Sequence, residues 1–143
     1  MQPSKPVSFV SASEPLLEVR NLSIPGTSID NLSLSVNNGE LIGVLGDTST
    51  GKTSLLLSIL RLRKYHGSIL YKGANIEEIP KTDYYREVSF APEQPEQAFI
   101  ANTVANEVAY QLEEWGLDPS EISRRVWESL ELLGLRDYAW YPI

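Results

Sequence analysis

The feature that most restricts the fold of this chain is a glycine-rich segment at residues 46–53, Gly-Asp-Thr-Ser-Thr-Gly-Lys-Thr. It fits the pattern G-x-x-x-x-G-K-[ST] at every fixed position. The apolar run Glu40–Leu45 before it is typical of a strand buried on both faces of a parallel sheet. The segment Thr53–Leu62 after it is rich in leucine and free of Pro and Gly, which favours a helix. The sequence therefore predicts strand, loop and helix in succession.

The fixed residues of this loop have the properties needed to hold a phosphate group. Gly46 and Gly51 allow backbone conformations in which successive N–H groups converge on an anion, and the following helix adds its unpaired first-turn amides. Lys52 supplies positive charge to the β- and γ-phosphates, Thr53 offers a hydroxyl ligand to Mg²⁺, and Ser54 reaches toward the α-phosphate. A plain glycine turn between a strand and a helix is the alternative. The predicted binding residues are Gly46, Asp47, Thr48, Ser49, Thr50, Gly51, Lys52, Thr53 and Ser54.

Composition limits the partners of this chain. Its 143 residues, 42% of them hydrophobic, suffice for one domain with a core. A net charge of −7 argues against a nucleic-acid surface, which needs clustered Lys and Arg. Cysteine is absent, which excludes disulfides and thiolate metal sites. No segment approaches the roughly 20 apolar residues that span a bilayer, so a role at a membrane requires docking on an embedded protein.

Further strands and two helices are indicated around the loop. Thr103 can cap one helix. A second begins at Asp118, with Pro119 at the first helical position and Glu121 completing a capping box, and Gly134 suits its left-handed end. The predicted apolar faces are Val104, Val108 and Leu112, and then Ile122, Val126, Leu130 and Leu133. The predicted strands are Leu16–Leu22, Leu32–Val36, Gly67–Gly73 and Val88–Ala91.

Beyond Glu14, the chain resembles the ATP-binding subunits of ABC transporters. Three segments around the loop carry the resemblance: Leu17–Ser23, Ile29–Glu40 and Gly67–Gly73. Three later segments, Glu93–Val104, Asn106–Tyr110 and Gly116–Ile122, are most similar to the energy-coupling-factor and cobalt-type importer ATPases. The order of these pieces, more than any one of them, separates this family from other P-loop proteins.

The resemblance implies an α/β fold, a partial P-loop ATPase core with an antiparallel β lobe and the start of a helical lobe. The expected divisions are a disordered lead-in at 1–15, an incomplete ATP-binding core at 16–100 and a helical subdomain from 101 to 143. The implied function is that of an ATP-binding subunit that couples ATP binding and hydrolysis to import of a metal ion or vitamin. The alternative is a non-hydrolysing nucleotide-binding module that acts by docking.

The resemblance also implies cofactors, partners and a location. The cofactors are ATP and Mg²⁺, and the partners are a membrane-embedded transporter subunit and a second ATP-binding subunit. Such proteins are cytoplasmic and peripheral at the inner face of the cell membrane. Phe99, Ile100 and Trp115 fall where the family's groove accepts a short helix of the membrane subunit. For Trp115, packing into the core is an equally good interpretation.

Two family positions differ in this sequence. The glutamine that contacts Mg²⁺ in the family falls on Glu93, with Gln94 as the competitor if the loop shifts by one residue and a solvated loop acid as the alternative. A carboxylate binds a hard cation more strongly than an amide, so Glu93 is a predicted metal ligand beside Thr53. The family's adenine-stacking aromatic has no counterpart between Val10 and Leu45, where Ile24 is the candidate for apolar contact with the base.

Two family motifs have no counterpart before Ile143: the signature Leu-Ser-Gly-Gly-Gln and the Walker B strand that ends in Asp-Glu. Hydrolysis needs a second carboxylate for Mg²⁺ and a residue that orients water. We therefore expect the chain to be a truncated or split subunit that binds ATP without turning it over by itself. The only histidine, His66, is predicted to lie in a surface loop.

Overall fold

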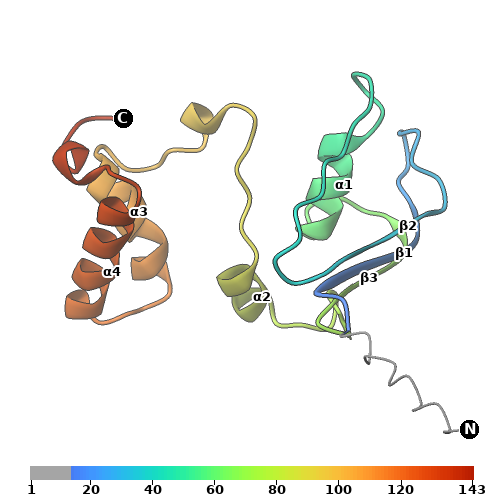
Figure 1. Ribbon diagram of the computed structural model, residues 1–143, viewed down its shortest axis with the longest axis horizontal. Helices are drawn as coiled ribbons and strands as arrows, with labels where there is room; N and C mark the ends of the chain where they lie inside the picture. The colour runs from blue at the N-terminus through green and yellow to red at the C-terminus, as the bar shows by residue number, and fades with distance from the viewer. Residues whose placement is uncertain (1–13) are drawn as a thin grey trace, which may run out of the picture. The chain divides into compact units, whose positions relative to one another are not determined.

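The computed structural model describes residues 14–143, so the predicted lead-in at 1–15 lies almost wholly outside the described residues. The chain divides between Phe90 and Ala91 into two compact units, each with its own hydrophobic core. Figure 1 shows the course of the chain through the described elements. The predicted boundary between 100 and 101 falls further along the chain, inside the second unit.

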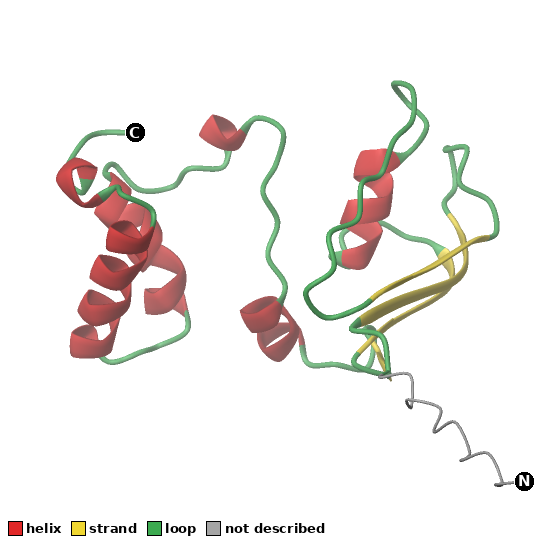
Figure 2. Ribbon diagram, viewed as in Figure 1, coloured by secondary structure: helices red, strands yellow, loops and turns green. Residues whose placement is uncertain are grey.

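The first unit is built on an antiparallel sheet of four strands in the order β2-β1-β3-β4 (Figure 2). The predicted antiparallel lobe is therefore present. On the central strand, Val19 lies opposite Leu34 on one side and Ile69 on the other. His66 opens the third strand opposite Ser23 rather than lying in a loop. The bounds are β1 Leu17–Ser23, β2 Leu32–Val36, β3 His66–Tyr71 and β4 Ala74–Asn75.

Two helices, α1 (Lys52–Ile59) and α2 (Lys81–Glu87), complete the first unit. The hydroxyl of Tyr84, a buried residue of α2, donates to the Ile59 carbonyl at 2.8 Å, and that of Tyr85 donates to the Leu60 carbonyl at 2.7 Å. These bonds satisfy two carbonyls that the end of a helix leaves unpaired. The buried core consists of Val19, Leu22, Ile24, Leu55, Ile69, Ile76 and Tyr84.

The predicted strand at Glu40–Leu45 is wrong, because these residues form an extended segment without strand pairing. Leu41 and Leu45 are 97% and 95% exposed. A parallel strand is held by hydrogen bonds from neighbouring strands, and no strand in the described part of the chain pairs with this segment. The predicted strand at Val88–Ala91 fails in the same way.

The second unit is a pair of helices, α3 (Val104–Glu114) and α4 (Pro119–Leu132), with the short 3-10 turns η1 (Pro95–Gln97) and η2 (Arg136–Tyr138) on either side. Both helices begin as predicted. The Thr103 hydroxyl accepts from the Asn106 amide at 3.4 Å, and the Asp118 carboxylate accepts from the Ser120 amide at 2.9 Å. The unit therefore uses local caps that its sequence specifies.

The C-terminal end of α4 leads the chain back onto α3. Gly134 adopts the predicted left-handed conformation, with φ of 67°. Beyond it, the Ala139 carbonyl accepts from the Ala105 amide at 2.8 Å. The predicted apolar face of α4 is confirmed at Val126 and Leu130, which are buried, but Leu133 is 67% exposed because it lies at the helix end. The buried residues of this unit are Ala105, Val126, Leu130 and Ala139.

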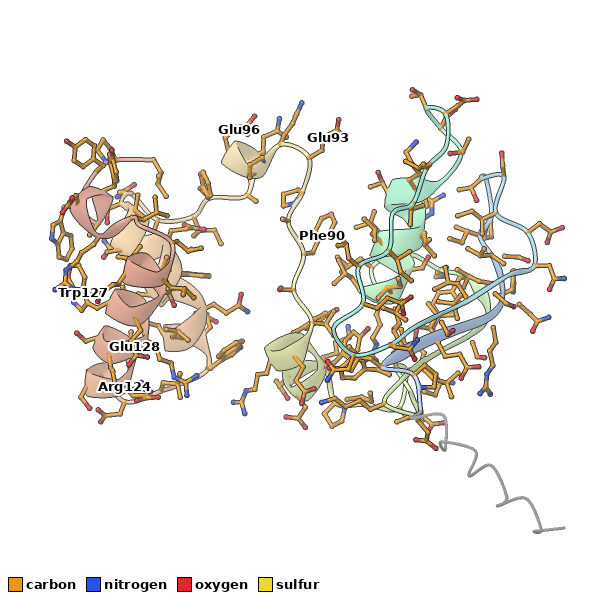
Figure 3. The ribbon with its side chains drawn as sticks, viewed as in Figure 1. Phe90, Glu93, Glu96, Arg124, Trp127 and Glu128 are labelled. Atoms are coloured by element: carbon orange, nitrogen blue, oxygen red, sulfur yellow. The ribbon has the colours of Figure 1, made fainter. Side chains whose placement is uncertain are left out.

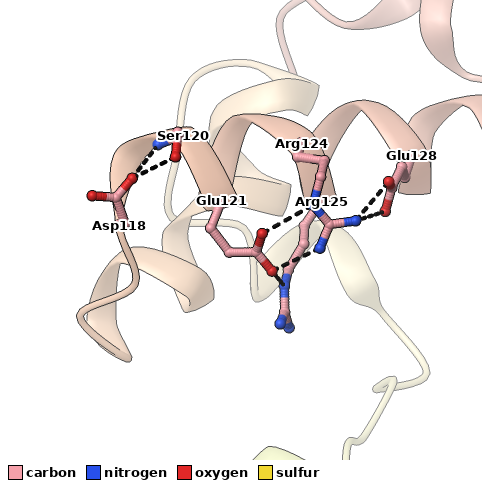
Figure 4. A network of polar contacts seen from close by, with 6 residues as sticks. All are labelled: Asp118, Ser120, Glu121, Arg124, Arg125 and Glu128. Atoms are coloured by element: carbon pink, nitrogen blue, oxygen red, sulfur yellow. Dashed lines mark hydrogen bonds and ion pairs between the residues drawn. The ribbon is translucent and has the colours of Figure 1, made fainter.

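A polar network covers the outer surface of α4 (Figure 4). The Arg124 guanidinium donates to the carboxylates of Glu121 and Glu128 at distances of 2.6–2.9 Å, and Arg125 donates to Glu121 at 2.6 Å. The Glu121 carboxylate is therefore engaged with Arg124 and Arg125. The hydrogen bonds from Arg124 and Arg125 lower the pKa of Glu121 to about 2, so this carboxylate stays charged well into acid.

Candidate phosphate-binding loop

The loop at residues 46–51 leads directly into α1, and its second glycine is required by both conformation and space. Gly51 has φ of 110°, a region that L side chains rarely adopt. A Cβ atom there would lie 2.9 Å from the Cβ of Thr27 and 3.0 Å from the Cδ1 of Ile29. These two residues of the β1–β2 connection thus pack against the loop. No sequence pattern indicates this contact, because only the folded chain brings the two segments together.

The first glycine is required by packing within the loop. A Cβ atom at Gly46 would lie 2.8 Å from the Thr50 hydroxyl oxygen. That hydroxyl donates to the Asp47 carbonyl at 2.8 Å, which closes the loop on itself. Ser49, between them, also has a positive φ of 68°. The loop is therefore a tight turn whose shape depends on small side chains at its ends.

The Lys52 ammonium lies back over the loop that precedes it. Its Nζ donates to the Gly46 carbonyl at 2.6 Å and to the Asp47 carbonyl at 2.7 Å. The positive charge is thus held within the turn formed by residues 46–51. If a phosphate binds in this turn, the Lys52 ammonium donates to its charged oxygens instead of to two neutral carbonyls. Hydrogen bonds between two charged groups are roughly twice as strong as those between neutral groups.

The N-terminus of α1 differs from those of α3 and α4 in having no side-chain cap. Gly51 is its N-cap residue, and the first turn holds no acidic side chain. Its first-turn amides are therefore left to an external acceptor, and the positive end of the helix dipole favours an anion. Thr53 is exposed in this first turn, and Ser54 is partly buried beside it. The predicted loop residues thus form one continuous structure around the start of α1.

The burial of Ile24 excludes this residue as a contact for the adenine base. Its side chain is 2% exposed and belongs to the core with Val19 and Leu22. The residue points into the core because the Ile24 amide donates to the Ile29 carbonyl at 3.0 Å and turns the chain at the end of β1. Apolar contact with a base therefore has to come from another residue.

Glu93 and Gln94 belong to the second unit, in the segment before η1 (Figure 3). Both side chains are exposed, and the Gln97 side-chain amide Nε2 donates to the Gln94 side-chain oxygen. Along residues 14–143, no three His, Cys, Asp or Glu side chains gather into a metal-binding group. The role of Glu93 as a metal ligand remains a prediction.

The motif G-x-x-x-x-G-K-[ST] at residues 46–53, folded into a glycine loop that leads into the uncapped start of α1, is typical of P-loop nucleotide-binding proteins. Comparison with known families identifies the member of this class: the family described as ABC transporter matches residues 29–143. The chain belongs to the ABC transporter ATP-binding family.

Individual relatives agree with this assignment. A protein of Methanosarcina mazei named "Putative ABC transporter ATP-binding protein" is 31% identical over 127 residues, which cover 86% of this chain and 26% of the relative. A Bacillus cereus protein of the same name is 32% identical over 129 residues, covering 84% of this chain and 23% of the relative. The chain thus spans about a quarter of the length of these curated relatives. Within residues 14–143, no helix is both long enough and apolar enough to cross a bilayer.

Proposed function

We propose that this chain binds the triphosphate of ATP together with Mg²⁺ at residues 46–54, as part of an ATP-binding subunit. The single observation that carries this proposal is the position of the Lys52 ammonium, 2.6 and 2.7 Å from the loop carbonyls and next to the uncapped start of α1. Cation and helix amides then act on the same anion. Thr53, exposed in the first turn of that helix, supplies the metal ligand.

The Mg²⁺ part of this proposal is tested by replacing Thr53 with valine, which keeps the shape of the side chain but removes its oxygen. We expect Mg²⁺ to increase ATP affinity of the unaltered chain in calorimetric titrations. The Thr53→Val chain should lose most of that increase and keep its Mg²⁺-free affinity, because only the metal ligand is removed. Thr82→Val, an exposed threonine of α2, is the matched control. An undiminished Mg²⁺ effect in Thr53→Val would refute Thr53 as a ligand.

Glu93 is proposed as the second protein ligand of the metal. Its support is the family position and the affinity of carboxylate oxygen for Mg²⁺. The same titrations apply to Glu93→Ala, which should lose part of the Mg²⁺ effect, with Glu96→Ala as the matched control in the neighbouring turn η1. If ATP binding by the two variants depends equally on Mg²⁺, Glu93 is not a metal ligand and is a solvated acid of the loop.

At the level of the whole protein, we propose an importer subunit at the inner face of the membrane, paired with a second ATP-binding subunit and a membrane-embedded subunit. A metal ion or vitamin is the proposed cargo, on the resemblance of residues 93–122 to the energy-coupling-factor and cobalt-type importer ATPases. Phe99 and Ile100, 45% and 63% exposed, offer an apolar contact for the membrane subunit.

Cysteines placed at Phe99 and Ile100 test this partner. With a short thiol crosslinker in cells, we expect both to capture an integral membrane protein, because the family resemblance places these two positions where the membrane subunit docks. Tyr110→Cys, a residue of α3 that is 38% exposed, is the control and should capture none. Capture of soluble proteins alone from all three positions would argue against a transporter subunit.

A further inference from the structure

The second unit contains a groove that neither the candidate loop nor the proposed contact at Phe99 and Ile100 uses. It lies along α3 and α4 and encloses about 360 Å³. Small side chains line it on both helices, Ala109 on α3 and Ser123 on α4, and the indole rings of Trp127 and Trp140 line it as well. Small residues next to large flat ones leave room for an inserted apolar side chain.

The two indoles are held in place although one of them is largely exposed. Their ring centroids are 6.1 Å apart with an interplanar angle of 72°, an edge-to-face contact. The Arg136 guanidinium lies 5.6 Å from the Trp127 ring centroid. Trp140 nevertheless remains 67% exposed. Fixed, accessible tryptophans are the residues that most often dominate binding energy at protein interfaces.

The second unit as a whole carries a strong negative charge. Residues 91–143 contain ten acidic and three basic side chains, and each of the three arginines is ion-paired with a glutamate of α4. Glu113 is the charged residue that lines the groove, and its side chain is exposed. An occupant of this groove therefore gains by carrying positive charge.

We propose that the α3–α4 groove binds a basic amphipathic helix of a partner protein. An apolar side chain of that helix enters between Ala109 and the two tryptophans, and a lysine or arginine near it faces Glu113. The charge argues against two other occupants. A second copy of this unit brings the same excess of acidic residues, and an anionic lipid surface is repelled by it.

The test uses the full chain and a fluorescently labelled 16-residue helical peptide of leucine and lysine with a single apolar face. We expect saturable one-to-one binding in fluorescence anisotropy. Trp140→Ala should weaken it roughly tenfold or more, the effect of losing a buried aromatic anchor. Ala109→Leu fills the groove without removing its aromatic wall and should weaken binding to a similar extent. Glu113→Gln should weaken binding mainly at low salt, because it removes an exposed charge.

Matched controls separate the groove from the general charge of the unit. Tyr110→Ala removes a partly exposed aromatic of α3 outside the groove, and Glu96→Gln removes one exposed charge from η1. Both should bind the peptide as the unaltered chain does. The proposal is overturned if a scrambled peptide of the same composition binds equally, if Trp140→Ala and Ala109→Leu both keep full affinity, or if no peptide binds. Because the measurement contains no nucleotide, its failure leaves the ATP proposal untouched.

Discussion

Replacing Lys52 with alanine should weaken Mg²⁺-ATP binding roughly tenfold or more, which corresponds to about 1.4 kcal/mol or more for the loss of a charge-assisted contact to phosphate. The ammonium is the cation that the structure holds within the turn of residues 46–51, bonded to the Gly46 and Asp47 carbonyls. The variant leaves the α1 amides in place, so residual binding should remain. Calorimetric titration with Mg²⁺-ATP measures the change directly.

Lys64→Ala provides the matched control, because Lys64 is an exposed lysine of the same unit beyond the end of α1. It removes the same charge from the chain and should leave ATP affinity unchanged. Both variants should unfold at the temperature of the unaltered chain, since hydrogen bonds on an exposed loop add little to stability. Equal ATP affinity for Lys52→Ala and the unaltered chain would overturn the phosphate-site assignment.

The parts of the fold that the sequence predicted correctly depend on neighbouring residues. Thr103 and Asp118 cap their helices through amides three and two positions away, respectively, and Gly134 ends α4 through its own backbone angle. Likewise, β1 and β2 pair across a short connection that contains Pro25 and Gly26. Such interactions can be predicted because their energies are decided within a few residues.

The parts that could not be predicted depend on distant segments. The apolar run at 40–45 has strand composition, but a strand forms only where a neighbour accepts and donates its backbone hydrogen bonds. The reverse case is α2, whose sequence Lys-Thr-Asp-Tyr-Tyr-Arg-Glu has no helical apolar stripe. Its tyrosines bond to carbonyls at the end of α1, 25 residues earlier. Tertiary contacts, or their absence, therefore determine the secondary structure of both segments.

The same distinction applies to the candidate site. The motif identified the loop residues, because glycine, lysine and threonine at this fixed spacing each have a role in binding phosphate or Mg²⁺. It gave no indication that Thr27 and Ile29 pack against Gly51, nor that Ile24 is buried in the core. Those facts follow from the way in which the β1–β2 connection turns. The prediction that Ile24 contacts the adenine base therefore failed, whereas the predictions about the loop are consistent with the structure.

Gly67→Ala should be among the most damaging single changes in the first unit. Gly67 has φ of 100°, and a Cβ atom there would lie 2.5 Å from the Asn21 carbonyl oxygen and 2.6 Å from that of Arg20. Both atoms belong to the backbone of β1, at the irregular part of its pairing with β3. The sheet must open to admit a methyl group, and the residue must also hold a strained angle. We expect the variant to lose about 3 kcal/mol or more of folding free energy.

Gly39→Ala is the matched control, because Gly39 also has a positive φ, 76°, but an added Cβ would meet nothing within 4 Å. It isolates the strain of the backbone angle and should cost about 1 kcal/mol. Hydrogen exchange of the β1 and β3 amides in urea measures the first unit, while fluorescence reports the second, since all three tryptophans lie beyond residue 90. In Gly67→Ala, protection in the sheet should fall while the fluorescence transition stays in place. If Gly67→Ala and Gly39→Ala lose similar amounts of sheet protection, β1 accommodates the added methyl group without cost. The close approach of β1 and β3 would then not be the reason for glycine at position 67.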